Sequence, residues 1–491
     1  MRSNLENHFS KFRKNTIGIE TSFESPYGLQ KIVYADWIAS GRLYNPIEKR
    51  IQEVFGPFVA NTHTETSETG TRMTHAYHYA QKIIKKHVNA GSNDVIITTG
   101  SGMTTVINKL QRILGLKSCG YVTKSKCIRE EEKPVVFITH MEHHSNHTSW
   151  YATSAEVVII EPNIDLEVDL NDLKNKLELY KDRKFKIGAF SACSNVTGVY
   201  TPYYQMARLM HEYGGVCFVD FAASAPYVDI NMHPENPMEK LDAIYFSPHK
   251  FLGGPGSSGV LIFDSNMYHL SIPDNPGGGT VEWTNAWGEY KFIDNIEIRE
   301  DGGTPGFLQA IRIALAIDLK NQMGVENIKK REDELLEIAF AEFEKIDGIH
   351  VLADNIKKRL GVISFYHLEI HYNLFVKLLN DKFGIQMRGG CACAGTYGHY
   401  LLEVSHDRSK EITDKINSGD LSEKPGWVRL SLHPTMTNDE IYFIMNAIKQ
   451  IVVNKTDWIK DYIYDSRKNE FYHNQKRNNS SEIIRNWFVL D

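Results

Sequence analysis

A lysine follows a short apolar segment in the middle of the chain: Lys250 lies within residues 245–254, YFSPHKFLGG, directly before Phe251 and Leu252. Apolar surroundings lower the pKa of a lysine and favour its neutral, nucleophilic amine. Such an amine can form a Schiff base with the aldehyde of a cofactor. Ser247 and His249 lie beside it and could donate hydrogen bonds to a phosphate group. Taken alone, the stretch is more typical of a surface lysine in a turn, so the rest of the chain has to decide.

Other residues with useful chemistry also follow apolar segments. They are a glycine turn, a histidine, an asparagine and an aspartate: Ser101-Gly102-Met103, His143, Asn195 and Asp220. The turn precedes a predicted helix, whose free backbone N–H groups attract phosphate, although many such turns are plain connections. Its GSG pattern is not the GxGxxG of dinucleotide sites, so NAD is not supported. A carbonyl cofactor needs a Schiff-base lysine, a carboxylate at its ring nitrogen, a group that stacks on the ring and a phosphate cup, and the chain offers all four.

The elements that must position these residues alternate between strand and helix over roughly residues 93–265. This alternation predicts a mainly parallel sheet in a three-layer α/β/α domain. Ligands of such sheets bind at the carboxyl ends of the strands, where the candidate residues lie. The remaining pattern predicts a smaller α+β domain. We therefore expect an arm at 1–30, a large cofactor-binding domain at 31–330, a small domain at 331–454 and a tail at 455–491.

Histidines and cysteines allow a metal site to be considered. Four histidines lie within residues 140–147, but no HExxH pattern is present, and a polar active-site loop is the favoured interpretation. Six cysteines are few for 491 residues, so we expect a reducing, cytoplasmic location and no disulfide scaffold. Cys119 and Cys127 fall in residues 117–133, which resemble an exposed insertion.

Composition narrows the class of partner. The net charge is −6 and no long basic run occurs, so neither nucleic acid nor an anionic membrane is an expected partner. No apolar run is long enough to span a bilayer, and the polar N-terminus is not typical of a secretory signal.

In combination, the motifs resemble the class V aminotransferase group of pyridoxal-phosphate enzymes, and most of all its cysteine desulfurase and selenocysteine lyase branch. The resemblance covers about residues 30–450 and implies fold type I. The similar segments are EHHSN at 142–146, SNVTG at 194–198, VDFAAS at 219–224, SPHK at 247–250, GGTP at 302–305, RGGCACA at 388–394 and RLSL at 429–432.

The resemblance also implies a role for each residue. His143 is expected to stack on the cofactor ring, Asn195 to reach its phenolic oxygen, Asp220 to bind its pyridine nitrogen and Lys250 to form the Schiff base. Thr304 is expected to reach the phosphate of a neighbouring subunit, which implies a homodimer. Arg429 is expected to bind the substrate carboxylate, and Cys393 to carry the persulfide. The phosphate of the chain's own cofactor is expected to be bound by Ser101, Gly102, Met103, Ser247 and His249.

The chain departs from the family pattern at several places. Ala223 stands where the family has a glutamine, and Ser224 could replace its hydrogen bond. Met103 stands where a threonine is usual, and a longer segment than in the short members separates Cys393 from Arg429. Cys391 is an additional thiol.

The expected function is therefore desulfuration of L-cysteine to L-alanine through a persulfide on Cys393, with a sulfur-acceptor protein as a further partner. Three alternatives stay open. The chain could be a selenocysteine lyase or another class V aminotransferase, epimerase or lyase that acts on a different amino acid. It could also be a non-catalytic binding protein with the same fold. Cys393 itself could be a buried small apolar residue or, with Cys391, part of a metal site.

Overall fold

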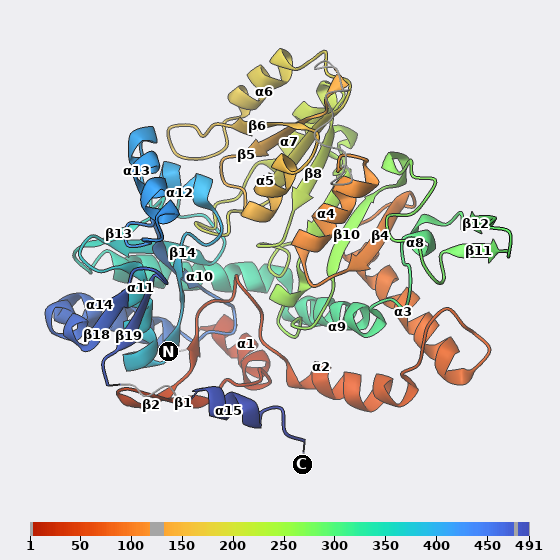
Figure 1. Cartoon of the computed structure of the whole chain (residues 1–491). Coiled ribbons are helices and arrows are strands. Elements are labelled where there is room, and N and C mark those ends of the chain that lie inside the picture. Colours follow the sequence, from red (N-terminus) through yellow and green to blue (C-terminus); the bar gives the residue numbers. More distant parts are fainter. Residues whose placement is uncertain (1–2, 118–131, 476–479, 491) are drawn as a thin grey trace.

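The computed structural model describes residues 3–117, 132–475 and 480–490, and it is built around a seven-stranded sheet (Figure 1). The order of the strands across the sheet is β4 (Asp94–Thr99), β10 (Gly259–Asp264), β9 (Ala243–Phe246), β8 (Val216–Asp220), β7 (Lys186–Ser191), β5 (Val135–Thr139) and β6 (Glu156–Ile160). Strands β6, β5, β7, β8 and β9 are parallel to one another, whereas β10 is antiparallel to both of its neighbours.

Both faces of this sheet are buried because its strands are almost continuously apolar, which is typical of parallel sheets covered on both sides. Alternate residues of each strand join two different apolar clusters; on β10, for example, Leu261 belongs to one and Ile262 to the other. One cluster includes α4 (Met103–Ile113) and α5 (His144–Tyr151). The other includes α6 (Leu170–Leu179), α7 (Tyr203–Glu212) and α9 (Phe307–Met323). The predicted three-layer α/β/α fold is therefore confirmed.

A second, four-stranded antiparallel sheet belongs to the C-terminal part of the chain. Its order is β13 (Ile349–Val351), β14 (Val362–His367), β17 (Trp427–Ser431) and β16 (Arg388–Gly390). Helices α10 (Val325–Phe343), α11 (Tyr372–Phe383) and α14 (Asn438–Trp458) pack with it, and α12 (Gly395–Leu401) and α13 (His406–Asn417) lie between β16 and β17. The antiparallel register places Arg388 opposite Arg429. The four-stranded sheet and its helices confirm the predicted smaller α+β unit.

The N-terminal segment packs against the C-terminal part of the chain. Helix α1 (Asn4–Lys14) buries Phe9 and Phe12 in the core, and it is followed by β1 (Ser22–Ser25) and β2 (Gly28–Lys31). Strand β3 (Val33–Tyr34) pairs in parallel with β15 (Ile385–Gln386), and Asp36 bridges to Ser431 of β17. Helices α2 (Asn45–Arg50) and α3 (Glu68–His87) come next, and α3 packs against α9.

Two hairpins and a terminal helix complete the molecule. The hairpin of β11 (Val281–Thr284) and β12 (Tyr290–Phe292) projects from the large unit, followed by α8 (Ile296–Arg299) (Figure 1). The hairpin of β18 (Tyr462–Asp465) and β19 (Glu470–His473) lies against α11, and α15 (Ser480–Asn486) follows. The insertion predicted at 117–133, with Cys119 and Cys127, lies almost entirely outside the described residues, and the proposed division into domains stays a prediction.

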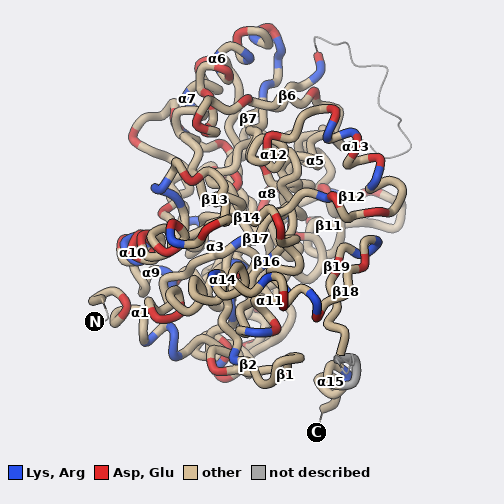
Figure 2. The backbone as a smooth tube through the Cα atoms, turned by 90° about the vertical axis from the view of Figure 1, so that its left-hand side faces the viewer, with Lys and Arg blue, Asp and Glu red and all other residues tan. Residues whose placement is uncertain are grey.

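Charge is distributed without a dominant sign. Figure 2 shows lysines and arginines interspersed with acidic residues along the outer helices, for example on α6, α10 and α13. In the described part of the chain, no helix combines the length and apolar character needed to cross a membrane.

Candidate active site

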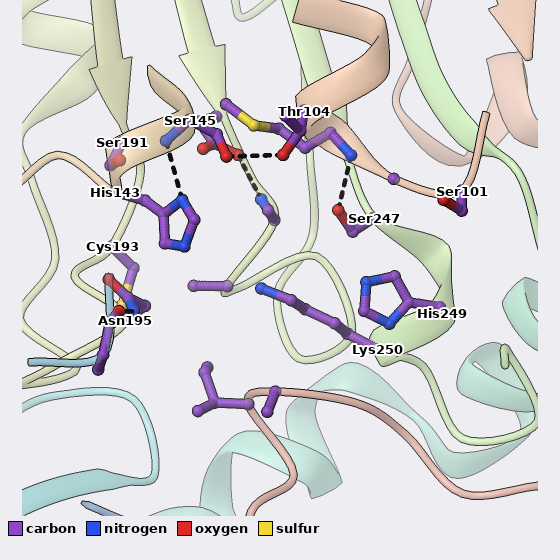
Figure 3. Close-up of a pocket in the computed structure, with 18 of the residues that line it drawn as sticks. Ser101, Thr104, His143, Ser145, Ser191, Cys193, Asn195, Ser247, His249 and Lys250 are labelled. Carbon is purple, nitrogen blue, oxygen red and sulfur yellow. Dashed lines mark hydrogen bonds between the residues drawn. The ribbon is translucent and has the colours of Figure 1, made fainter. Parts of the chain in front are cut away.

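The carboxyl ends of the parallel strands bring the candidate residues together around one cavity of about 320 Å³ (Figure 3). Strand β4 leads into residues 101–103, β5 into His143, β7 into Asn195, β8 ends at Asp220 and β9 leads into Lys250. The small sheet contributes Arg388 and Arg429 to the wall. Of the sequence-predicted site residues, the cavity is lined by Ser101, Gly102, Met103, His143, Asn195, Asp220, Ser247, His249, Lys250 and Arg429.

Lys250 ends a short 3₁₀ turn, Pro248–Lys250, and its side chain extends into the cavity (Figure 3). Burial lowers the pKa of its amine to about 8, and the positive charges of Arg429 and Arg388 act in the same direction. The carboxylate of Asp220 opposes this shift. The amine can therefore lose its proton near neutral pH, as a nucleophile or a general base requires.

Asp220 is the last residue of β8, and its carboxylate accepts a hydrogen bond of 2.8 Å from the backbone N–H of Ala222. Burial raises the pKa of Asp220 to about 7; Lys250 lowers it and the nearby carboxyl of Glu142 raises it further. A buried carboxyl group is most stable when a cation lies beside it. A protonated pyridine nitrogen is a cation that would stabilise the Asp220 carboxylate.

The histidine predicted to stack on a ring is neutral. His143 caps α5, where its Nδ1 accepts a hydrogen bond of 3.1 Å from the backbone N–H of Ser145. Burial lowers the pKa of His143 to about 3, with a further contribution from the charge of Lys250. An uncharged imidazole at the cavity wall is suited to packing against an aromatic ring.

The start of α4 forms a polar part of the cavity wall. Gly102 is the residue before the helix, and the backbone N–H of Met103 donates a 2.8 Å hydrogen bond to Ser247 Oγ. A Cβ atom on Gly102 would lie 3.1 Å from the same oxygen, so this position has little room for a side chain. The hydroxyls of Thr104 and Ser145, which the sequence did not single out, lie 2.6 Å apart at the same wall. Helix N-termini and hydroxyls of this kind bind phosphate.

Arg429 lies at the far wall in β17 and is almost fully buried. It donates to a carboxylate oxygen of Asp36 at 2.8 Å and to the carbonyl of Asn195 at 3.1 Å. Its Nε atom has no hydrogen-bond partner among the described residues, and neither has the buried Oδ1 of Asn195. Buried polar atoms are rarely left unpaired, so these two indicate that a polar ligand completes the site.

The donor set fits pyridoxal phosphate. A reactive lysine, a buried carboxyl, a neutral imidazole and a helix start are arranged around one cavity, and unpaired polar atoms remain at its wall. Ala223, which stands where the family has a glutamine, lines the cavity, whereas Ser224 does not. The hydroxyl of Ser224 is buried and without a partner in the described structure, so it is not placed to replace that glutamine.

Two predicted residues lie outside this cavity. Thr304 is exposed and donates a hydrogen bond of 3.2 Å to Asn61 Oδ1. Cys393 lines a second cavity, with its sulfur 3.9 Å from a guanidinium nitrogen of Arg388. Cys193 lines the first cavity, but burial raises the pKa of its thiol far above the ordinary value, so it is not a thiolate.

The histidines of residues 140–147 use ring nitrogens in hydrogen bonds within the protein. His144 Nε2 accepts from the backbone N–H of Gly395 at 2.9 Å, and ring nitrogens of His140 and His147 lie 3.2 Å from the Leu166 carbonyl and the Tyr151 hydroxyl. Within the described ranges, no group of three or more histidine, cysteine or acidic side chains is placed to hold a metal ion.

Comparisons with known proteins identify the family. The model of the aminotransferase class-V family matches residues 33–443. A probable cysteine desulfurase of Halalkalibacterium halodurans is 28% identical over 373 residues, which cover 74% of this chain and 84% of the relative. A probable cysteine desulfurase of Staphylococcus epidermidis is 28% identical over 371 residues, with the same coverage of 74% and 84%.

Solved structures agree. The chain is similar to the apo cysteine desulfurase of Thermococcus onnurineus NA1, with a TM-score of 0.72 at 23% identity, covering 90% of this chain and 98% of that one. It is also similar to the S-sulfonic acid form of cysteine desulfurase CsdA from Escherichia coli, with a TM-score of 0.69 at 20% identity and coverages of 91% and 98%. At these identities the two structures establish the fold alone. By its family match, this chain belongs to the class-V aminotransferases, which are pyridoxal-phosphate-dependent enzymes.

Proposed function

We propose that this chain is a pyridoxal-phosphate-dependent cysteine desulfurase that takes sulfur from L-cysteine as a persulfide on Cys393 and leaves L-alanine. The observation that carries the proposal is the position of the thiol loop. Arg388 and Ala392 line the lysine cavity, and the sulfur of Cys393 lies 3.9 Å from the Arg388 guanidinium. The proposal makes this thiol the nucleophile that takes the substrate sulfur.

The residues of the cavity would hold the cofactor as follows. Lys250 would bind the aldehyde carbon, Asp220 the pyridine nitrogen, and His143 would pack against the ring. The start of α4, with Ser247 and His249, would hold the phosphate. When bound, pyridoxal phosphate supplies an electron sink for the amino acid's reacting carbon atoms.

Lys250 is then the proton carrier at the substrate α-carbon. Its pKa of about 8 lets the amine accept and return a proton near neutral pH. Arg429 is the proposed partner of the substrate carboxylate; its two terminal nitrogens donate to Asn195 and Asp36, and its buried Nε has no hydrogen-bond partner among the described residues. The hydrogen bonds to Asp36 and Asn195 fix the orientation of the Arg429 guanidinium, and with it the orientation in which the substrate carboxylate binds.

The sulfur step belongs to Cys393. Its thiolate forms a bond to the substrate sulfur while the bond between that sulfur and the substrate β-carbon breaks. The electron pair of the broken bond stays with the β-carbon, which takes up a proton to become the methyl group of alanine, and the sulfur remains on Cys393 as a persulfide. Cys393 lies just outside the lysine cavity, where Ala392 forms the wall. The proposal therefore requires the Cys393 side chain to turn past Ala392 when substrate is bound.

The position of Cys393 outside the lysine cavity also favours a second candidate function. If the loop does not turn, Cys393 takes no part, and the cavity performs another class V reaction on a different amino acid, with selenocysteine lyase among the options. The lysine, aspartate and arginine roles are unchanged in this case. The substrate and the need for a thiol then distinguish the two candidates.

The deciding experiment measures alanine and sulfide released from L-cysteine by the purified holoenzyme in the presence of a reductant. We expect Cys393→Ala to abolish alanine formation, because the acceptor for the substrate sulfur is gone, and to keep the cofactor absorbance band. Cys391→Ala serves as the matched control, with the same side chain removed two positions away. Alanine formation by Cys393→Ala at the wild-type rate would contradict desulfuration and favour the second candidate.

A further inference from the structure

A second cavity of about 820 Å³ adjoins the lysine cavity. Arg388 and Ala392 line both, whereas Cys391 and Cys393 line only the second. Neither the proposed persulfide chemistry nor the cofactor explains this space. Its volume falls in the range of small-molecule sites, which is roughly 300–1,000 Å³.

The loop between the cavities has an unusual backbone. Ala392 and Cys393 have φ angles of 50° and 57°, and the N–H of Ala394 donates a 3.0 Å hydrogen bond to the carbonyl of Cys391. Two successive positive φ angles are typical of a type I′ turn, which usually needs glycine or asparagine. Such strain persists only where the surroundings enforce it, and it clusters at functional sites.

Two hydrogen bonds from the large domain fix the turn. The side-chain amide of Asn195 donates to the carbonyl of Ala392, and the backbone N–H of His144 donates to the carbonyl of Cys393, both at 2.8 Å. The turn therefore holds both cysteines at the wall of the same cavity.

The opposite wall is built by the C-terminal hairpin, which lies beyond the family match at residues 33–443. Asn469 at its tip is buried: its side-chain amide donates to the Tyr372 hydroxyl at 2.7 Å, and its backbone carbonyl accepts from the Asn373 side chain at 2.6 Å. Tyr372 in turn donates to the carbonyl of Lys424 at 3.0 Å. This buried network makes the hairpin a fixed part of the cavity.

The charged side chains of the wall are mainly cationic: Lys377, Arg388, Lys424 and Lys468 against Glu470. Lys377 already pairs with Asp381. Among the described residues, Lys424 and Lys468 have no ion pair, and both are exposed. The cavity therefore suits an occupant that carries negative charge.

We propose, on the basis of the desulfurase function above, that Cys391 is a relay thiol. It takes the sulfane sulfur from the Cys393 persulfide and passes it to a small, negatively charged thiol bound in the second cavity. The pair of cysteines and the cationic cavity would then form a sulfur exit that is separate from the cavity of Lys250.

Each transfer is balanced and needs no oxidant. The Cys391 thiolate bonds to the outer sulfur of the Cys393 persulfide, the bond from that sulfur to Cys393 Sγ breaks, and Cys393 leaves as a thiolate. The acceptor thiolate then takes the same sulfur from Cys391 in the same way. Attack on the inner sulfur would instead join two cysteines only two residues apart, for which a relaxed disulfide is poorly suited.

The location of the sulfur tests the relay without relying on turnover. The holoenzyme is incubated with L-cysteine carrying labelled sulfur, alkylated and digested, and fragment masses assign the label to a residue. We expect label on Cys391 in the wild type, on Cys393 alone in Cys391→Ala, and on neither in Cys393→Ala. Buried Cys193 and Cys217 serve as internal controls. Label on Cys393 alone in the wild type, or a Cys391–Cys393 disulfide, would overturn the relay.

The acceptor is tested with three thiols compared at equal thiolate concentration: dianionic mercaptosuccinate, uncharged 2-mercaptoethanol and cationic cysteamine. We expect mercaptosuccinate to discharge the labelled enzyme about tenfold faster than cysteamine, and Lys424→Gln with Lys468→Gln to remove this preference. The control pair Lys329→Gln and Lys449→Gln, exposed on other helices, should keep it. Equal rates for all three thiols would overturn the anionic acceptor. Absence of alanine from the wild type would instead refute the desulfurase function, so the two failures are distinguishable.

Discussion

The buried environment of Lys250 should be measurable as a lowered pKa of its amine. An exposed lysine titrates near 10.5, but burial lowers the pKa of Lys250 to about 8. A lower pKa means that the amine is already neutral at lower pH. We expect the rate at which the cofactor-free protein develops its absorbance band with added pyridoxal phosphate to rise with pH through a midpoint near 8. Stopped-flow absorbance measures this rate, and Lys250→Ala, which has no amine, should develop no band.

Substitution of Asp220 should shift the pH midpoint of the same assay, and the direction of the shift can be predicted. Its carboxylate raises the pKa of Lys250, so Asp220→Asn should move the midpoint to lower pH. Arg388 has the opposite effect, and Arg388→Gln should move the midpoint upward. Because the pKa of Asp220 is itself about 7, the difference from the wild type should be greatest above that pH, where its carboxylate is charged. A midpoint that rises in Asp220→Asn would contradict this electrostatic account.

The sequence could predict the convergence of these residues because each follows an apolar strand, and the carboxyl ends of parallel strands meet at one edge. It did not predict the ion pair of Asp36 with Arg429, which joins residues almost 400 positions apart along the chain, at 2.8 Å. Nor did it separate Cys393 from the lysine cavity. Ala392, which lies between the two cavities, has a left-handed conformation that its residue type disfavours, so the sequence alone does not predict this turn.

At the level of elements, the alternation of strands and helices predicted the sheet but not its one reversed strand. Strand β10 follows β9 through residues 247–258, which contain a 3₁₀ turn but no α-helix, and a connection without a crossover helix is typical of an antiparallel pair. The reversal places β4 next to β10, so that the Ser101 turn and the Ser247 turn meet across the end of one strand.

The hairpin of β18 and β19 gives a prediction at this scale. Asn469 has a φ of 56° and makes three buried or half-buried hydrogen bonds, to Tyr372, Asn373 and Tyr464. Asn469→Ala should lower the free energy of unfolding by about 2–3 kcal/mol, because two side-chain hydrogen bonds are lost and alanine disfavours positive φ. Urea denaturation followed by tryptophan fluorescence measures this change.

Two control variants separate the causes. Asn469→Gly removes the same hydrogen bonds, but glycine adopts a positive φ without strain. The variant should therefore lower the free energy of unfolding by roughly 1 kcal/mol less than Asn469→Ala does. Arg467→Ala, exposed in the same turn, should change the unfolding free energy by less than about 0.5 kcal/mol. If Asn469→Ala behaved like Arg467→Ala, the hairpin would not be fixed to α11 by this network.

At the scale of the whole molecule, the two sheets meet at the lysine cavity, and Thr304, like Cys393, lies outside it. Thr304 lies in an exposed loop after α8, and the hairpin of β11 and β12, which precedes α8 in the chain, has Trp283, Trp287 and Tyr290 exposed. Exposed aromatic residues of this kind are frequent at protein interfaces. Both features are accounted for if Thr304 serves the phosphate of a second subunit in a homodimer.

A mixing experiment tests whether the sites are shared. Thr304→Asp places a negative charge where a phosphate would bind, and Lys250→Ala removes the reactive amine; each homodimer should be inactive with cysteine. In a heterodimer of the two, the subunit with Lys250 receives Thr304 from its partner, so coexpression should restore about a quarter of the wild-type sites by random pairing. If Thr304 served its own subunit, no intact site would form in any pairing. Sedimentation of the wild type as a dimer, together with restored activity in the mixture, is the expected result, and an active monomer would refute it.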